Sequence, residues 1–257
     1  MSRRSWDAAS YHRVAGPQER WGIEVLDRLA LRGDETVLDA GCGTGRVTQH
    51  LLDRLPAGRV VGVDGSDSMI AAARRVLAEG VAAGRVDLHV ADLLELSVPE
   101  PVDVVFSTAT FHWILDHDRL FERLFAVLVP GGRLVAQCGG AGNLASVFAA
   151  AHAVNAHPRF APYFHGWTRS YMASPEETTE RLARTGFTDV RCWSEPRAEV
   201  PDEPEEYLRT VNYGAYLQRL PEELRDGWFA QVWSRLAQPV TLDYVRLNID
   251  ARRPDRP

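Results

Sequence analysis

The chain has 257 residues, of which 45% are hydrophobic, so it can bury the core of one large α/β domain with an inserted or appended cap. Its formal net charge of -6 argues against nonspecific binding to nucleic acid, which needs a basic face. No apolar run approaches the length of a membrane span, and Arg3-Arg4 is followed by no apolar stretch, so we expect a cytoplasmic protein without a signal peptide.

The N-terminal part should consist of an arm followed by one helix. From Pro17 onward, Trp21, Val25 and Leu29 recur at the spacing of one helix face. In the preceding arm, Tyr11 can act as an apolar contact that pins the arm to the domain.

A short apolar strand, Val37–Ala40, runs into three glycines at alternate positions, Gly41, Gly43 and Gly45. The next segment, 46–55, has its apolar residues at helical spacing. Glycines let the backbone turn sharply and let a ligand approach it closely, so this strand, loop and helix predict a nucleotide-type binding corner.

A second apolar strand, Arg59–Val63, ends at Asp64. An acidic residue at this point can accept hydrogen bonds from both hydroxyls of a ribose. Position 46 is Arg, whereas a dinucleotide fingerprint needs a third glycine there for close helix packing. An oxidoreductase of the NAD type is therefore improbable.

Three more strands follow, over 85–90, 102–107 and 133–138, and helices alternate with them. This alternation predicts a doubly wound sheet. Ligands lie beyond the carboxyl ends of the strands in such sheets, so the loop 108–113 should face the ligand. In the second half we expect helices over 143–156, 175–185, 207–220 and 221–237, an aromatic-rich segment over 157–174, and strands over 186–193 and 242–249.

The segment Asp39-Ala40-Gly41-Cys42-Gly43-Thr44-Gly45 resembles the cofactor loop of class I methyltransferases that use S-adenosylmethionine, and Val63-Asp64, Ala91-Asp92 and Pro130-Gly131-Gly132 stand where that family has them. The resemblance implies that the glycine loop borders the methionine part and that Asp64 holds the ribose. It also implies that Asp92 bonds the adenine amino group, although Asp92 could simply cap the next turn. It makes the N-terminal arm a candidate lid over the cofactor.

The residues that we predict to bind S-adenosylmethionine are Asp39, Gly41, Cys42, Gly43, Thr44, Gly45, Asp64, Gly65, Met69, Ala91, Asp92, Leu93 and Thr108. Phe111-His112-Trp113, Tyr207-Leu208-Arg209-Thr210 and the closing segment 246–253 narrow the resemblance to trans-aconitate methyltransferases, which esterify a carboxylate of a small polyacid. The related malonyl carrier-protein methyltransferases resemble the first half as well. The aromatic segment 160–171 could hold an aromatic or hydrophobic acceptor.

A carboxylate is already ionised at neutral pH, so ester formation needs no general base. A hydroxyl or amine acceptor would need one, and His112 is then the best candidate for a catalytic residue; it is alternatively a steric wall or a satisfied loop histidine. Arginine is the side chain best suited to bind a carboxylate, because its guanidinium group can donate two parallel hydrogen bonds. The residues that we predict to bind the acceptor are Tyr11, Phe111, Trp113, Trp167, Arg169, Tyr207 and Arg209.

We therefore predict an α/β fold, a doubly wound Rossmann-like sheet of about seven strands with helices on both faces and a helical substrate cap. The expected divisions are an arm and helix (1–34), a cofactor-binding core (35–140), a cap (141–240) that includes a sheet strand near 187–193, and a last strand and tail (241–257). The three cysteines are widely spaced, so they predict neither a disulfide framework nor a zinc cluster, and we expect no metal.

The predicted function is S-adenosylmethionine-dependent methylation of a small molecule, on a carboxylate oxygen. The alternatives are methylation of a natural-product hydroxyl or amine with His112 as the base, and a catalytically inactive protein that binds the cofactor. We expect a small-molecule acceptor as partner, neither nucleic acid nor membrane, and a monomer or a homodimer.

Overall fold

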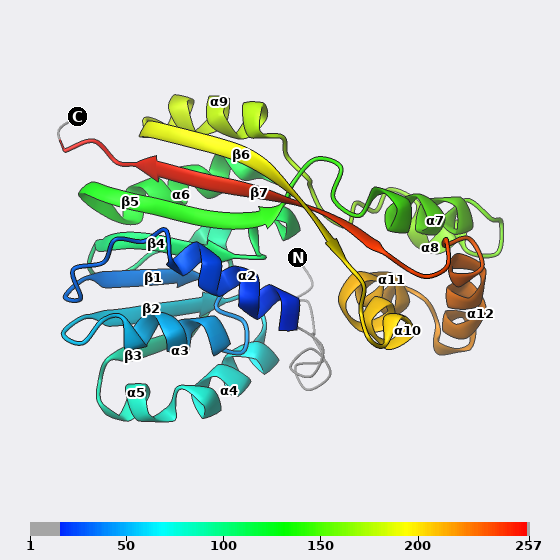
Figure 1. The fold of residues 1–257 in the computed structure, drawn as a ribbon, viewed down its shortest axis with the longest axis horizontal. Coiled ribbons are helices and arrows are strands. Elements are labelled where there is room, and N and C mark those ends of the chain that lie inside the picture. The colour runs from blue at the N-terminus through cyan, green and yellow to red at the C-terminus, as the bar shows by residue number, and fades with distance from the viewer. Residues whose placement is uncertain (1–15, 256–257) are drawn as a thin grey trace.

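The computed structural model describes residues 16–255, and its centre is one seven-stranded sheet in the order β3-β2-β1-β4-β5-β7-β6 (Figure 1). The strands are β1 (Thr36–Ala40), β2 (Arg59–Asp64), β3 (Val86–Val90), β4 (Val102–Thr108), β5 (Leu128–Gly139), β6 (Thr188–Glu199) and β7 (Leu242–Arg252). The first five strands are parallel, and β7 runs antiparallel between β5 and β6. The strand order reverses between β1 and β4, where a ligand crevice forms in open sheets of this kind.

Helices cover both faces of the sheet, as the alternating sequence pattern predicts. The helices are α2 (Gly16–Leu26), α3 (Arg46–Asp53), α4 (Asp67–Val76), α5 (Ala78–Ala82), α6 (His117–Val127), α7 (Ala145–Asn155), α8 (Ala161–Phe164), α9 (Pro175–Thr185), α10 (Pro204–Tyr207), α11 (Gly214–Arg219) and α12 (Glu222–Trp233), with the short helical turns η1 (Leu93–Glu95), η2 (Phe111–Trp113) and η3 (Leu208–Asn212). Within residues 16–255, none of them is long and apolar enough to cross a membrane.

The central strand β4 separates two hydrophobic cores. Val105 belongs to the core under α6 and α9, together with Phe121 and Leu182. Its neighbour Phe106 points to the opposite face and packs with Leu51 of α3. Because successive side chains of a strand alternate between the faces, a continuous apolar run such as β4 can be buried on both sides.

A third core holds together a helical lobe, by which we mean α7, α8, α10, α11 and α12. Its centre is aromatic: Trp228 stacks on Tyr216 with ring centroids 5.4 Å apart, and Tyr213 meets Trp228 edge-on at 5.4 Å. The lobe stands beyond the carboxyl ends of the parallel strands, and β6 and β7 extend into it (Figure 1). Many aromatic residues of the second half of the chain therefore form the core of this lobe.

Several elements differ from the sequence prediction in extent. Strand β5, expected over 133–138, already begins at Leu128, so Pro130–Gly132 falls inside it. The helix expected over 207–220 is interrupted by η3, a π-helical turn in which the Tyr213 amide donates to the Leu208 carbonyl at 2.7 Å. Strand β6 continues to Glu199 because β7 provides a long antiparallel partner, and such distant pairing leaves little local signal.

Candidate functional site

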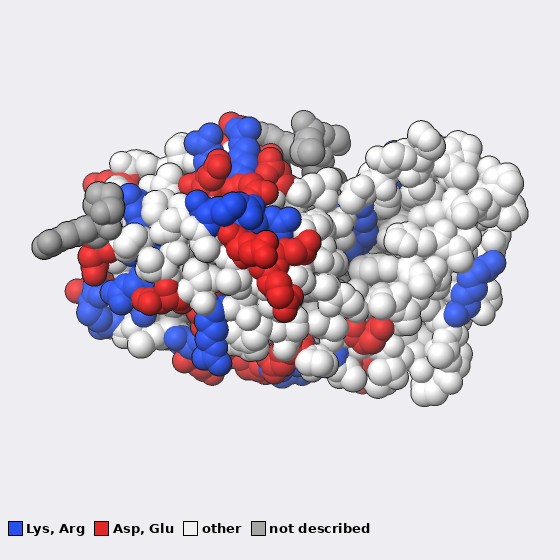
Figure 2. Space-filling model, turned by 90° about the horizontal axis from the view of Figure 1, so that it is seen from above, with Lys and Arg blue, Asp and Glu red and all other residues white. Residues whose placement is uncertain are grey.

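A cavity of about 850 Å³ lies between the carboxyl ends of β1, β2 and β4 and the helical lobe. Figure 2 shows the surface hollowed between the two parts of the molecule, with charged side chains gathered over the sheet and few over the lobe on this face. The residues lining the cavity include Gln18, Gly41, Gly43, Asp64, Met69, Asp92, Thr108, His112, Trp113, Asn143, Phe148, Trp167, Arg169, Arg219, Tyr244 and Arg246.

Gly41 and Gly43, in the loop after β1, are required for different reasons. Gly41 has a φ of 92°, and a Cβ there would lie 2.0 Å from the hydroxyl oxygen of Thr110, so no side chain fits. Gly43 has a φ of 54° and lines the cavity, and a Cβ there would meet no protein atom within 4 Å. Gly41 therefore serves the packing of the loop, whereas Gly43 leaves backbone open to a ligand.

Asp64, at the end of β2, joins the glycine loop to the cavity wall. Its Oδ2 accepts the amide of Gly43 at 3.0 Å, and its Oδ1 accepts the amide of Ser66 at 2.9 Å. Burial raises the pKa of Asp64, and the two amides oppose that rise. Each carboxylate oxygen can accept a further hydrogen bond, so the group can hold the loop and still receive ligand donors.

Asp39 lies below the loop rather than in the cavity. It is 2% exposed and its Oδ2 accepts the hydroxyl of Thr48 at 2.7 Å, which ties β1 to α3. Burial raises the pKa of Asp39 to about 7; the Thr48 bond lowers the pKa and the charge of Asp64 raises it further. The structure thus gives Asp39 a supporting place behind the ligand-facing residues.

Most of the predicted cofactor residues border the cavity. Those that line it are Gly41, Gly43, Asp64, Gly65, Met69, Ala91, Asp92, Leu93 and Thr108. Asp39, Cys42, Thr44 and Gly45 do not line it. The first three are buried, and a Cβ at Gly45 would lie 2.9 Å from the side chain of Leu77. The exposed Asp92 accepts a hydrogen bond from the Leu94 amide at 2.9 Å and caps η1. The alternative prediction, that Asp92 caps the next turn, is thereby confirmed.

His112 lines the cavity from η2 and is 8% exposed. Its Nδ1 accepts the amide of Gly139, the last residue of β5, at 3.2 Å. A backbone amide can only donate, so the neutral imidazole carries its proton on Nε2. In this state the ring can donate a hydrogen bond only through Nε2.

Two buried arginines also line the cavity. Arg169, 8% exposed, lies over the rings of Trp113 and Phe148, with its guanidinium carbon 4.4 and 4.7 Å from their centroids, and donates to the Asn212 carbonyl at 3.1 Å. Arg246, 4% exposed, comes from β7, and its Nε donates to Oε1 of Gln137 at 3.3 Å. Both guanidinium groups are oriented by neutral groups in these contacts.

Charge is divided between the two sides of the cavity. Among the described lining residues, those from position 18 to 116 include the acids Asp64, Asp92 and Asp116 and no arginine. The described lining residues from position 143 onward include Arg169, Arg219 and Arg246 and no acid. We call the lining formed by residues 18–116 the sheet side, and the lining formed by residues 143–246, which includes Arg246 of β7, the lobe side. The sheet side is therefore suited to a cationic ligand and the lobe side to an anionic one.

Only some of the residues predicted to bind the acceptor line the cavity. Trp113, Trp167 and Arg169 line the cavity, and Tyr11 lies outside the described residues. Three predicted positions have to be corrected, because the structure places Phe111, Tyr207 and Arg209 outside the cavity lining.

Packing explains each correction. Phe111 is fully buried against Phe121. The Tyr207 hydroxyl is bonded to Tyr244 at 2.8 Å inside the lobe. Arg209 pairs with Asp226 at 2.9 Å on the lobe's outer side.

Arg246 was missed by the sequence reasoning, although a signal for it exists. Polar residues at Gln137, Arg246 and Asn248 interrupt strands that are otherwise apolar at their inward positions. A buried polar group needs partners, so such positions in neighbouring strands are candidates for a site.

Residues 37–132 match the sequence family described as "Methyltransferase domain". The trans-aconitate 2-methyltransferase of Acidovorax ebreus (strain TPSY) is 37% identical over 132 residues, which cover 51% of this chain and 49% of that protein. The trans-aconitate 2-methyltransferase of Variovorax paradoxus (strain S110) is 29% identical over 256 residues, 94% of this chain and 93% of that protein. In the matches of higher identity, the chain spans about half the length of its curated relatives.

Solved structures share the fold. Phosphoethanolamine N-methyltransferase 2 of Haemonchus contortus, in complex with S-adenosyl-L-methionine, superposes with a TM-score of 0.63 at 23% identity over 96% of this chain and 56% of that one. A putative methyltransferase of Bacillus halodurans C-125 has a TM-score of 0.61 at 16% identity over 91% of this chain and 98% of its own. Over residues 37–132 the chain therefore matches a methyltransferase domain, and over most of its length it shares the fold of the solved structures above. Its named relatives above are trans-aconitate 2-methyltransferases.

The raised pKa of Asp39 predicts a specific pH dependence of stability. Between the unfolded value of 3.8 and about 7, the folded state holds a proton that the unfolded state has lost, so stability falls as pH rises through this range. We expect the melting temperature of Asp39→Asn to fall less than that of the wild type between pH 5 and pH 8. The exposed Asp53 of α3 provides the control Asp53→Asn, which should follow the wild type. Parallel curves for all three proteins would contradict the assignment.

Proposed function

We propose that the protein is an S-adenosylmethionine-dependent methyltransferase that O-methylates a carboxylate of a small anionic molecule. The observation that carries the proposal is the division of charge across one cavity. S-adenosylmethionine would supply an electrophilic methyl group on a positively charged sulfur. Acids on one side suit this cation, and arginines on the other suit an anionic acceptor.

The residues of the sheet side fit the cofactor. Gly43 has an open path from its Cα into the cavity, which suits the methionine part of the ligand. Asp64 retains acceptor capacity for the ribose hydroxyls beside its two amide bonds. Met69 and Leu93 supply apolar surface in the same wall, where the flat adenine would lie. The roles of Gly43 and Asp64 are those that the resemblance of the loop implies.

The lobe side fits a carboxylate. Arg169 and Arg246 are buried, and charge-assisted hydrogen bonds are strong where water is excluded. A carboxylate is ionised at neutral pH, so the chain needs to bind, desolvate and orient it but not to deprotonate it. Well-oriented reactants gain about 7–11 kcal/mol in favourable cases, which makes positioning a sufficient source of catalysis. Trp113, Trp167 and Phe148 leave apolar wall for the body of the acceptor.

The hydrogen bond of His112 favours this acceptor over a hydroxyl or an amine. A general base needs an unprotonated nitrogen toward the substrate, but the Nδ1 lone pair faces the Gly139 amide and the proton resides on Nε2. As a donor, His112 can bond a carboxylate oxygen. For His112 to act as a base, the ring would have to give up the Gly139 bond and change tautomer.

The direct test is a screen for product. Purified protein is incubated with S-adenosylmethionine carrying a labelled methyl group and with a panel that pairs acids, trans-aconitate among them, with matched amides and alcohols. Mass spectrometry should find label in methyl esters of the acids. Label confined to hydroxyl or amine acceptors would overturn the carboxylate proposal, and no labelled product would favour an inactive cofactor-binding protein.

Cofactor binding should depend on Gly43 through access alone. Gly43→Val places a branched side chain in the open space at the cavity wall, so calorimetry should detect no binding of S-adenosylmethionine. Gly84 is a matched control: its φ is 69°, nothing lies within 4 Å of its virtual Cβ, and it does not line the cavity. Gly84→Val carries similar backbone strain and should retain wild-type affinity. Equal loss in both variants would show that backbone strain, and not access, is responsible.

The acceptor chemistry predicts a flat pH profile. Carboxylate ionisation is complete well above pH ~4.3, so the rate should change little from about pH 6 to 8. His112→Gln keeps a donor and should retain much of the activity. If His112 were a base, the rate would rise with a pKa near ~6.5, and the variant would lose roughly 10²–10⁴-fold. A sloping profile with an inactive variant would refute the carboxylate assignment and leave the methyltransferase assignment standing.

A further inference from the structure

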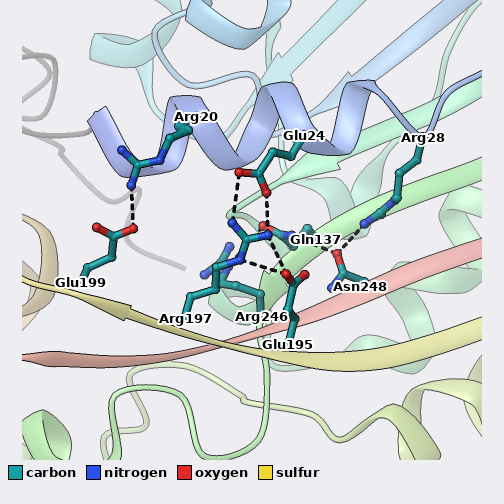
Figure 3. A network of polar contacts seen from close by, with 9 residues as sticks. All are labelled: Arg20, Glu24, Arg28, Gln137, Glu195, Arg197, Glu199, Arg246 and Asn248. Atoms are coloured by element: carbon teal, nitrogen blue, oxygen red, sulfur yellow. Dashed lines mark hydrogen bonds and ion pairs between the residues drawn. The ribbon is translucent and has the colours of Figure 1, made fainter.

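The buried polar residues of β5 and β7 form a chain of hydrogen bonds that ends at Arg246 (Figure 3). Arg246 Nε donates to Oε1 of Gln137 at 3.3 Å, and Nε2 of Gln137 donates to Oδ1 of Asn248 at 2.9 Å. These three side chains are 4%, 3% and 0% exposed. Buried polar groups destabilise a protein unless they are hydrogen-bonded, so a polar network inside a hydrophobic sheet needs a physical reason.

The contacts of Arg28, at the end of this hydrogen-bond network opposite Arg246, fix the orientation of the side-chain amides. Arg28, in the turn that follows α2, donates to the same Oδ1 of Asn248, and also to the carbonyl of Ala136 at 3.0 Å. It pairs with Asp250 at 3.2 Å. Since an arginine can only donate, Oδ1 of Asn248 must face it, and Gln137 must present its NH2 group to that oxygen. The carbonyl of Gln137 is thereby turned toward Arg246.

Strand register brings these groups together. Gln137 lies opposite Asn248, and Gly139 lies opposite Arg246, in the antiparallel pair of β5 and β7. The amide of Gly139 also holds Nδ1 of His112. The carboxyl end of β5 therefore orients Arg246 and His112, two of the three donors that the proposed function assigns to the acceptor.

The neutrality of Gln137 matters as much as its direction. An amide carbonyl orients a guanidinium group without adding a negative charge beside it, whereas a carboxylate at the same place would compete with an anionic ligand for the same cation. We propose that Gln137 is a positioning residue that aims Arg246 into the cavity for an anionic acceptor, and that Asn248 and Arg28 fix its amide. This inference rests on the proposed function.

The test measures acid binding without the cofactor. Citrate, trans-aconitate and benzoate are titrated calorimetrically into the wild type, and the acid that binds most tightly becomes the probe. Gln137→Glu should weaken probe binding by about tenfold or more, as expected when a charge-assisted bond is lost to a competitor. Gln137→Asn stays neutral but is shorter, so it should weaken binding by a smaller factor. Gln231→Glu, on α12 and outside the cavity lining, is the matched control and should bind as the wild type does.

The outcomes separate the two proposals. If no acid binds the wild type, the proposal of an anionic acceptor is refuted, and the inference about Gln137 is refuted with it. If the probe binds wild type and both Gln137 variants alike, or if Glu and Asn weaken it equally, Gln137 does not position Arg246 and the proposed function stands. Should Gln137→Glu fail to fold in a thermal melt, Gln137→Asn decides: unchanged affinity refutes the inference, and weakened affinity with an unchanged melting temperature supports it.

Discussion

Opposite charges on two sides of one cavity are the constraint on which the rest of this structure depends. A charged group withdrawn from water is destabilising unless other groups replace its hydration. On the sheet side, backbone amides of Gly43 and Ser66 do this for Asp64. On the lobe side, aromatic faces and a carbonyl surround Arg169, and an amide bonds Arg246. Both sides thus hold charge with groups that still permit a ligand of opposite sign.

The sheet topology explains why these groups meet. The reversal of strand order between β1 and β4 opens a crevice at their carboxyl ends, and the glycine loop and η2 both begin there. The antiparallel strand β7 then runs back along β5 and carries Arg246 to the same end of the sheet. The helical lobe closes the space from the other side and contributes Arg169. Parallel strands supply one wall, and the antiparallel strand connects it to the other.

The cofactor half was predictable because its signals are local. Strand, glycine loop and helix follow one another within a few residues around Gly41, and Asp64 closes the next strand. The acceptor half depends on long-range contacts, which the sequence pattern records weakly. Phe111 and Trp113 lie two residues apart, yet only packing against Phe121 decides that the first enters the core while the second lines the cavity. The sequence signal for Arg246 is only a polar residue in an apolar strand, and the pairing of β7 with β5 is what brings Arg246 to the site.

The most direct measurement is a crystal structure of the protein with S-adenosylhomocysteine and an acid that it methylates. The division of charge predicts the cofactor product against Gly43 and Asp64, and the acid's carboxylate on Arg169 or Arg246 with His112 Nε2 as a further donor. A cofactor bound elsewhere, or an acid seated away from both arginines, would contradict the account.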